Sequence, residues 1–231
     1  MGAMESVDGL AGWAALVADR TRAAFCLALL DGRAWTVGEL ARHAGVAVST
    51  ASEHADRLVQ GGLLVQRRQG RHRYLQLAGP DVAALIEAVS AAGADRPAPV
   101  TTMAGAHRRR NLAFARTCYD HLAGVIGVAV ADAMARDGLI SRAHGLALTE
   151  RGADRLAAIG VTLDPGAQRP VLRDCLDWTE RRTHLAGQVG AGLCRHAFGV
   201  GWIVRIGGSR AVKVTPAGRA ALRETLSVTL D

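Results

Sequence analysis

The chain has 231 residues, a length that allows one or two domains, each with a buried core. Charged residues make up 21% of the sequence and hydrophobic residues 49%, which argues against an intrinsically disordered protein. The 28 Lys and Arg residues outnumber the 21 Asp and Glu residues, and this excess favours a polyanionic partner. No apolar run is long enough for a transmembrane helix and no signal peptide is visible, so we expect no membrane insertion.

Cysteine usage and the absence of catalytic motifs narrow the class further. The four cysteines are widely spaced within apolar or helical patterns: Cys26, Cys118, Cys175 and Cys194. Such spacing fits reduced thiols better than a disulfide framework, so we expect a cytoplasmic protein. The sequence shows no nucleotide-binding loop, nucleophile elbow or catalytic carboxylate pair, so we do not expect an enzyme.

The first expected elements are two short helices. One runs from about Leu10 to Ala18 and carries apolar side chains at helical spacing: Leu10, Trp13, Leu16 and Val17. Farther along, Thr36 and Glu39 match the capping-box pattern, in which a hydroxyl and a carboxylate satisfy free amides at a helix start. We expect this capped helix to end at Gly45.

A helix from Val48 to Gln60 is expected after the next turn. Its narrow apolar face consists of Val48, Ala51, Ala55 and Leu58. Its polar face consists of Ser49, Thr50, Ser52, Glu53, His54 and Arg57. Small hydroxyl side chains let a helix approach the floor of the major groove, and His54 and Arg57 can reach bases or phosphates. A solvated amphipathic helix is the alternative, but the capped helix before it favours a helix-turn-helix.

A basic hairpin is expected next. Its two strands are supported by five apolar or aromatic residues on either side of a turn at Gln69–Gly70: Leu63, Val65, Tyr74, Leu75 and Leu77. Arginines gather near the tip with no acid among them: Arg67, Arg68, Arg71 and Arg73. A tip of this kind would contact phosphates or enter a minor groove. The capped helix, the polar helix and the hairpin together predict a winged helix-turn-helix that contacts double-stranded DNA.

Two apolar helix faces exceed what a minimal winged helix needs. The helix that opens at Pro80 and Asp81 carries one of them: Val82, Leu85, Ile86 and Val89. The helix from about Leu10 to Ala18 carries the other. The two faces could pair between subunits and form a twofold dimer suited to a pseudo-palindromic operator, whereas packing within one chain is the alternative.

Roughly the first 90 residues resemble the ArsR/SmtB family of bacterial transcriptional repressors. The resemblance is carried by residues 18–22 (ADRTR), the capped helix, residues 49–54 (STASEH), the wing and the helix after Asp81. It implies a homodimer that blocks transcription until a signal lowers its affinity for the operator. The ligands of the two standard metal sites of the family are missing, because residues 36–39 contain no cysteine and residues 81–95 contain no histidine. Metal sensing is therefore not transferred from the family.

The composition changes after this first half. Residues 93–107 are rich in Ala, Gly and Pro and are interpreted as a linker between a DNA-binding and dimerisation domain (1–92) and an effector domain (108–231). A basic segment, residues 107–110, begins the helical pattern of the second domain. An internal repeat follows, in which residues 121–124 (HLAG) recur as residues 184–187, residues 138–140 match 201–203, and residues 148–152 match 214–218.

Each repeat, at about 116–160 and 175–228, is expected to contain a helix, a hairpin and a Thr-initiated helix, as a winged helix does. The expected fold class is therefore mainly α with small β-hairpins (α+β), a winged helix-turn-helix domain followed by two winged-helix-like repeats. The hairpin tips at 142–145 and 206–210 are less basic than the first wing, so most DNA affinity should come from the first domain. Residues 116–124 and 175–182 also resemble a C-terminal extension of some ArsR-type regulators, which implies an effector or dimer-locking domain.

Candidate effector residues lie in this second half: Cys118, Asp120, His121, Cys175, Trp178, Glu180, Arg181 and His184. Cys118 and His121, three apart, are expected on one helix face. Cys175 and His184, nine apart on an expected helix, would project about 180° from each other and not obviously face one site.

Several interpretations of these residues stay open. Zinc accepts thiolate and imidazole ligands together, so Cys118 and His121 with one Cys or His of the second repeat could bind a metal ion; arsenite would require convergent thiolates. A thiol switch at Cys118 is a further alternative. Equally, Cys118 could be a small core residue, while Asp120 and Asp177 hold the two histidines in place.

An organic effector is the other option. Trp178, Glu180, Arg181 and Arg182 could form the wall of its pocket, or else a salt-bridged helix. The sequence as a whole predicts a homodimeric repressor that releases its operator when the C-terminal domain senses a metal ion or a small organic effector. The alternatives are a metal- or thiol-redox-responsive regulator and a winged-helix module that binds proteins.

Overall fold

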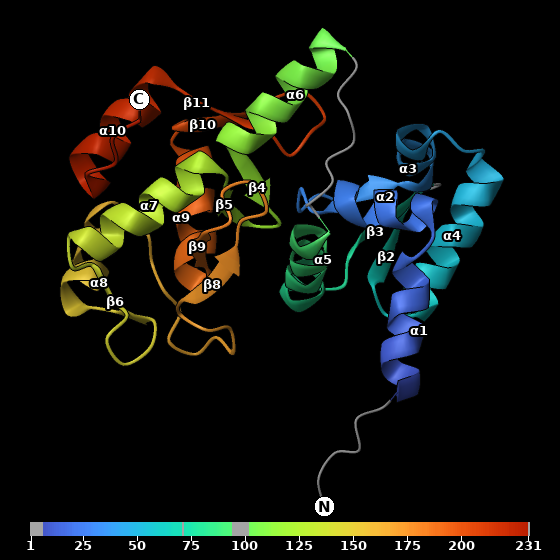
Figure 1. Ribbon diagram of the computed structural model, residues 1–231, viewed down its shortest axis with the longest axis horizontal. Coiled ribbons are helices and arrows are strands. Elements are labelled where there is room, and N and C mark those ends of the chain that lie inside the picture. Colours follow the sequence, from blue (N-terminus) through green and yellow to red (C-terminus); the bar gives the residue numbers. More distant parts are fainter. Residues whose placement is uncertain (1–6, 71, 94–101, 231) are drawn as a thin grey trace, which may run out of the picture. The chain divides into compact units, whose positions relative to one another are not determined.

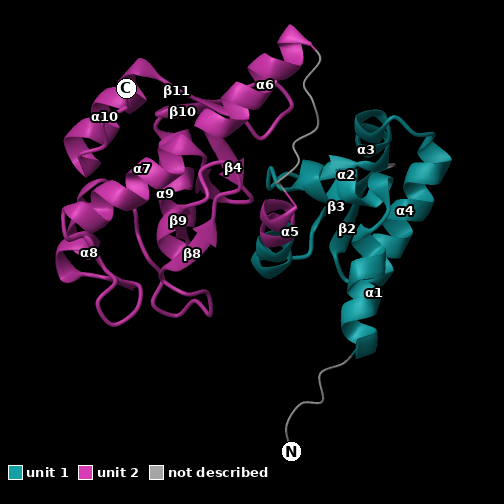
Figure 2. Ribbon diagram, in the orientation of Figure 1, with its two compact units in different colours: residues 1–86 teal, residues 87–231 magenta. Residues whose placement is uncertain are grey.

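The computed structural model of the chain describes residues 7–70, 72–93 and 102–230 (Figure 1). These residues form two compact units, 1–86 and 87–231, and the division falls within helix α5 (Pro80–Ala92) (Figure 2). None of the described helices has the length and apolar character that a membrane crossing requires.

The first unit combines four helices and part of α5 with a small sheet. The helices are α1 (Val7–Val17), α2 (Arg20–Leu29), α3 (Val37–Ala44) and α4 (Val48–Gln60). The strands are β1 (Trp35–Thr36), β2 (Leu64–Gln69) and β3 (His72–Leu77), paired antiparallel in the order β1-β3-β2. Fully buried Phe25, Leu40 and Leu75 come from α2, α3 and β3, so the core joins the helices to the sheet. Cys26 is buried beside Phe25, as predicted.

The local signals of the helix-turn-helix are confirmed. Thr36 and Glu39 form the capping box of α3, and Gly45 ends that helix in the left-handed conformation with a φ of 70°. Helix α4 has the predicted limits and buries Ala51, Ala55 and Leu58. Val48 departs from the prediction with 59% exposure, because it is the first residue of the helix and lies a turn before the residues that enter the core.

Two details of the wing were not predicted correctly. Gln69 pairs with His72 and so belongs to strand β2 rather than to the turn, and Gly70 has a φ of 57° that favours glycine. Strand β1 was missed, because two residues are too short for a periodic pattern to reveal. Arg71 lies outside the described residues.

The second unit begins earlier than the linker prediction allowed. Residues 103–107 belong to helix α6 (Met103–Phe114), because the Thr102 hydroxyl accepts a hydrogen bond from the Gly105 amide (3.1 Å) and caps the helix. Residues 94–101 of the expected linker lie outside the described residues.

Two copies of one arrangement follow α6. The first contains β4 (Arg116–Cys118), β5 (His121–Ala123), α7 (Val125–Arg136), β6 (Ile140–Ser141), β7 (Ala147–Leu148) and α8 (Glu150–Ala158). The second contains β8 (Arg173–Leu176), β9 (Thr183–Ala186), α9 (Gly187–Gly199), β10 (Ile203–Arg205), β11 (Val212–Val214) and α10 (Pro216–Leu226). Each pair of strands is an antiparallel hairpin. The predicted order of helix, hairpin and Thr-capped helix is confirmed, with Thr149 and Thr215 as the caps.

The hairpins β4–β5 and β8–β9 correct the sequence prediction, which placed their residues on helices. Tyr119 in the first turn has a φ of 59° and Arg181 in the second a φ of 54°, a conformation that no α-helix contains. The copies also interlock, since α7 packs against β9 and α9 packs against β5. Their shared core includes Ile126 and Met134 of α7 and Val189 of α9, so neither copy is an independent domain.

Candidate functional sites

The polar face of α4 is accessible along most of its length. Ser49, Glu53 and Arg57 are exposed, while Thr50 and Ser52 are half-buried. Because residues three and four apart share a helix face, these side chains form one continuous polar surface. An exposed polar face of this kind is typical of helices that enter a major groove.

His54 and Arg73 differ from the expectation that both would be available to DNA. His54 Nδ1 lies 3.5 Å from Asp19 Oδ1 and 3.4 Å from an Arg22 guanidinium nitrogen, at the start of α2. Arg73 forms a salt bridge of 2.7 Å with Asp56. Both side chains therefore have partners within the first unit, and Arg73 joins the wing to α4.

Two other arginines among the described residues of the wing are exposed. Arg67 and Arg68 follow each other on β2, where they face Tyr74 and Arg73 of β3 in register. Successive side chains of a strand point to opposite faces, so the two guanidinium groups flank the hairpin. The wing thus presents positive charge on both of its faces.

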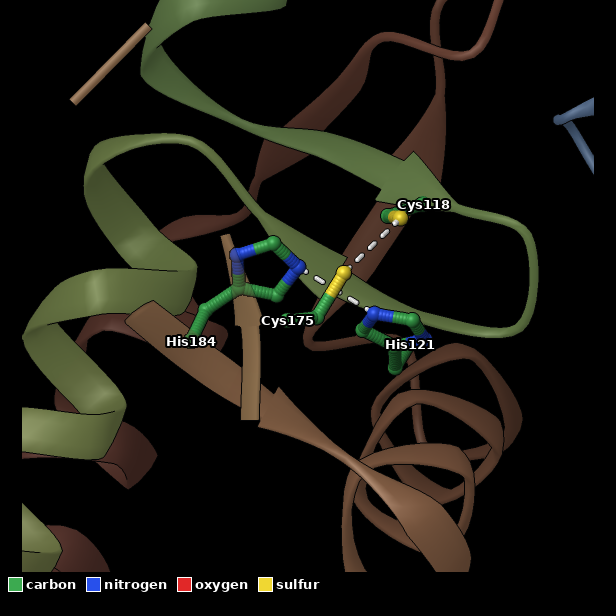
Figure 3. A group of neighbouring side chains, drawn as sticks. All are labelled: Cys118, His121, Cys175 and His184. Carbon is green, nitrogen blue, oxygen red and sulfur yellow. Dashed lines mark hydrogen bonds between the residues drawn. The ribbon is translucent and has the colours of Figure 1, made fainter. Parts of the chain in front are cut away.

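A compact Cys/His centre lies in the second unit, formed by Cys118, His121, Cys175 and His184 (Figure 3). Cys118 and His121 face each other in the register of β4–β5, and Cys175 and His184 do so in β8–β9. The Sγ atoms are 3.8 Å apart and the two Nε2 atoms 3.1 Å apart. One potential ligand atom from each residue lies within 4.8 Å of the other three, and no side chain is more than 7% exposed.

This geometry corrects the expectation that Cys175 and His184 would lie on one helix and would not obviously face one site. That prediction assumed a helix, on which a spacing of nine residues separates two side chains by half a turn. In a hairpin, directly opposed residues have neighbouring side chains whatever their spacing in sequence. The Cys/His centre therefore takes one opposed pair from each repeat.

Each histidine of the centre is backed by a carboxylate. His121 Nδ1 lies 3.2 Å from Asp120 Oδ1, and Arg169 forms an ion pair with the same carboxylate. His184 Nδ1 lies 3.4 Å from Asp177 Oδ2. Placement of both histidines by Asp120 and Asp177, one of the interpretations left open by the sequence, is thus present in the structure. The hydrogen bond with Asp120 favours the His121 tautomer with the proton on Nδ1, which directs the Nε2 lone pair into the centre, whereas His184 Nδ1 has no hydrogen-bond partner among the described residues.

The two thiols have opposite electrostatic environments. The hydrogen bond from Cys118 lowers the pKa of Cys175 strongly, and the His121 and His184 imidazoles lower it further against the effect of burial. The same hydrogen bond and burial raise the pKa of Cys118. Burial lowers the pKa of His121, but contacts with Asp120 and Cys175 outweigh it and raise that pKa. The Cys/His centre therefore favours one thiolate and one thiol in contact with imidazole.

The other candidate effector residues surround Asp177 in the loop between β8 and β9. Trp178 stacks on the Arg116 guanidinium, 4.7 Å from the ring centroid, and the Glu180 amide donates to Asp177 Oδ1 (3.2 Å). A hollow of about 540 Å³ lies elsewhere in this unit, against α6, β11 and α10, and its lining includes His107, Lys213 and Arg219. Trp178, Glu180 and Arg181 do not line that hollow. Arg182, which was expected beside them, is exposed and forms an ion pair with Asp132 (2.6 Å).

Comparison with known proteins agrees with the architecture of the first unit. The family model of a helix-turn-helix domain matches residues 17–67. The uncharacterised HTH-type transcriptional regulator YdfF of Bacillus subtilis strain 168 is 35% identical over 216 residues, which span 92% of this chain and 95% of that protein. The chain belongs to the helix-turn-helix transcriptional regulators. The resemblance to ArsR/SmtB-type regulators is thereby confirmed at the level of a winged helix-turn-helix transcriptional regulator.

Solved structures with local similarity include HlyU from Vibrio cholerae, 26% identical, with a TM-score of 0.35 and coverage of 38% of this chain and 95% of that one. The homodimeric winged helix-turn-helix DNA-binding domain of Mb0332 from Mycobacterium bovis, a possible ArsR-family regulator, is 30% identical. Its TM-score is 0.36, with coverage of 40% of this chain and 90% of that one. The family assignment rests on the full-length similarity to YdfF.

Proposed function

We propose that this regulator is a homodimeric repressor that binds a pseudo-palindromic operator through α4 and the wing, and releases it when the second unit receives a signal. The observation that carries the proposal is the exposed polar face of α4 beside the exposed Arg67 and Arg68. The Arg73–Asp56 salt bridge supports it, because it fixes the wing against the recognition helix. His54 and Arg73 accordingly act as positioning residues. The residues that contact DNA are Ser49, Arg57, Arg67 and Arg68.

Exposed apolar side chains support the homodimer. In α1, Val7 is 78% exposed and Leu10 is 73% exposed. In α5, Leu85 and Val89 are also exposed, at 44% and 48%. Apolar helix faces left in water are typical of subunit interfaces, and a twofold pair of α4 helices would suit two operator half-sites.

Substitution of Arg67 and Arg68 by alanine is expected to weaken DNA binding through lost phosphate contacts. Each lost contact removes about 0.9 from the slope of log affinity against log salt concentration, so the double variant should lose about 2. Titration of the full chain with promoter DNA at several salt concentrations measures this slope. The charge-matched control, Arg195→Ala with Arg223→Ala on exposed positions of α9 and α10, should keep it. A protein-binding module would be favoured instead if both double variants had the same salt slope, or if the chain bound DNA without preference for the promoter sequence.

We propose that the signal acts at the Cys/His centre. The repressor would then respond to a metal ion or to oxidation of its thiols. The support is that two thiols and two imidazoles are buried together there. We expect promoter affinity of the full chain to change on zinc addition or mild oxidation, and this response to vanish when Cys118 and Cys175 are both replaced by alanine. A response that survives in the double variant places the signal elsewhere, without affecting the conclusion from the wing variants.

A further inference from the structure

We propose that Cys118, His121, Cys175 and His184 bind one Zn²⁺ ion in a closed tetrahedral site that joins the two repeats of the second unit. This inference does not depend on repression or on the source of the signal. It rests on the distances between the ligand atoms, the carboxylates behind the histidines and the interlocked hairpins that bring the four residues together.

The distances fit the dimensions of a zinc site. Zinc–sulfur bonds of about 2.3 Å and zinc–nitrogen bonds of about 2.0–2.1 Å place tetrahedral ligands about 3.8 Å apart for two sulfurs and about 3.3–3.4 Å apart for two nitrogens. The Cys118 and Cys175 Sγ atoms are 3.8 Å apart, and the His121 and His184 Nε2 atoms are 3.1 Å apart. These two pairs are therefore close to the spacing of a tetrahedral site, and all four ligand atoms lie within 4.8 Å of one another.

The orientation of the histidines also calls for a cation. His121 Nδ1 is hydrogen-bonded to Asp120, while His184 Nδ1 lies 3.4 Å from Asp177 Oδ2 without a hydrogen bond, and the two Nε2 atoms face each other at 3.1 Å. When both Nδ1 atoms carry the proton, both Nε2 atoms present lone pairs to each other. Two such lone pairs repel at 3.1 Å unless a proton or a metal ion lies between them. A carboxylate behind a metal-bound imidazole is the usual arrangement around zinc, because it fixes the tautomer and strengthens the ligand.

The set of donor atoms selects the metal. Two thiolates and two imidazoles in a tetrahedron favour zinc, whereas Ca²⁺ and Mg²⁺ require oxygen ligands. Arsenite would be bound by converging thiolates alone. The Cys/His centre offers only two thiolates, because Cys26 and Cys194 do not belong to it, and its other two ligands are imidazoles. Four protein ligands leave no open coordination position, so the ion has a structural or regulatory role. On binding, the proton that remains on a thiol passes to solvent, so that both sulfurs bind the ion as thiolates.

Two glycines show how the fold makes room for the centre. A Cβ atom on Gly127 of α7 would lie 3.4 Å from the Cβ of His184, and one on Gly190 of α9 would lie 3.1 Å from the Cβ of His121. Each helix thus packs closely against the histidine of the other repeat. The Cys/His centre lies where the two repeats interlock, and an ion there would link both hairpins.

The test uses the reduced full-length chain, loaded with Zn²⁺ or Co²⁺ and then desalted. We expect one ion per chain, and for Co²⁺ the intense visible bands of a tetrahedral site together with thiolate-to-cobalt charge transfer. Cys118→Ala should abolish these bands, whereas Cys194→Ala should retain them, because Cys194 is equally buried but outside the centre. Circular dichroism of each variant reports whether the chain is folded.

Asp120→Asn provides a variant that keeps all four ligands. Loss of an outer-shell carboxylate is expected to lower zinc affinity about 10–100-fold, measured by competition with a chromophoric chelator. A folded wild-type chain that retains no ion, an octahedral Co²⁺ spectrum, or equal metal loss in Cys118→Ala and Cys194→Ala would overturn the proposal. Loss of DNA binding with metal binding intact would count against the repressor and leave the zinc site standing.

Discussion

Replacement of Asp177 by alanine is expected to lower the free energy of unfolding of the second unit by about 3–5 kcal/mol, the usual cost of removing one partner of a buried ion pair. Asp177 and Arg116 are both fully buried and are joined by a salt bridge of 2.9 Å. Asp177 Oδ2 also accepts a hydrogen bond of 2.6 Å from the Gly124 amide, at the start of α7. The variant would leave the Arg116 guanidinium charged in the interior and the Gly124 amide without its acceptor.

Asp174→Ala is the matched control, three residues away on β8. Asp174 forms a two-point contact with Arg142 at 2.7 and 2.8 Å, but both side chains are substantially exposed. Solvent screens such a pair, so its loss should cost about 0–1 kcal/mol. Urea unfolding followed by tryptophan fluorescence, with a chelator present to exclude metal effects, compares the two variants. Equal destabilisation by both substitutions would show that burial of the Arg116–Asp177 pair does not govern stability.

The parts of the fold that depend on residues close together in the sequence were predictable from it. The capping box at Thr36 and Glu39, the glycine at 45 and the spacing of apolar residues in α4 each determine local backbone conformation. The repeat was also visible, because both copies begin their last helix with a threonine cap. Together these signals were sufficient to identify the winged helix-turn-helix.

The Cys/His centre was not predictable in full, because its geometry depends on turns and on pairing between strands. All residues of β4 and β5 are buried, so the hairpin lacks the alternation of apolar and polar residues that identifies a strand. Its turn contains Tyr119 with a positive φ, a position that glycine would normally mark. The contacts between the hairpins join Cys118 to Cys175, which are 57 positions apart in the sequence, and His121 to His184, which are 63 positions apart. A single sequence gives no information about the distance between such residues.

The same limit applies to side chains assigned to DNA contact. The sequence alone does not distinguish one arginine of the wing from another. In the structure, Arg73 is paired with Asp56, whereas Arg67 and Arg68 are exposed. Which arginine is paired depends on how closely the hairpin approaches α4, and that is a tertiary property. Sequence identified the basic surface, and the structure distinguishes the members that hold it in place.

Gly190→Ala is expected to destabilise the second unit by about 1–3 kcal/mol through overpacking, despite the better helix propensity of alanine. The new Cβ would lie 2.2 Å from the Leu185 carbonyl oxygen and 2.8 Å from its carbon. Because these are backbone atoms, no rotamer change relieves the clash, and α9 must move away from β9. That movement would also displace His121, whose Cβ would lie 3.1 Å from the added methyl group.

Gly199→Ala on the same helix separates this close approach from a general effect of removing glycine. Gly199 is exposed, lies in the last turn of α9, and a Cβ there would meet no atom within 4 Å. This control should be neutral or more stable by up to about 1 kcal/mol, since alanine favours a helix over glycine. The midpoint temperature of thermal unfolding and the zinc affinity are measured on both variants. We expect both quantities to fall for Gly190→Ala and neither to fall for Gly199→Ala. If Gly190→Ala matched Gly199→Ala in both measurements, the interlocking of α9 with the hairpins would not determine the position of His121.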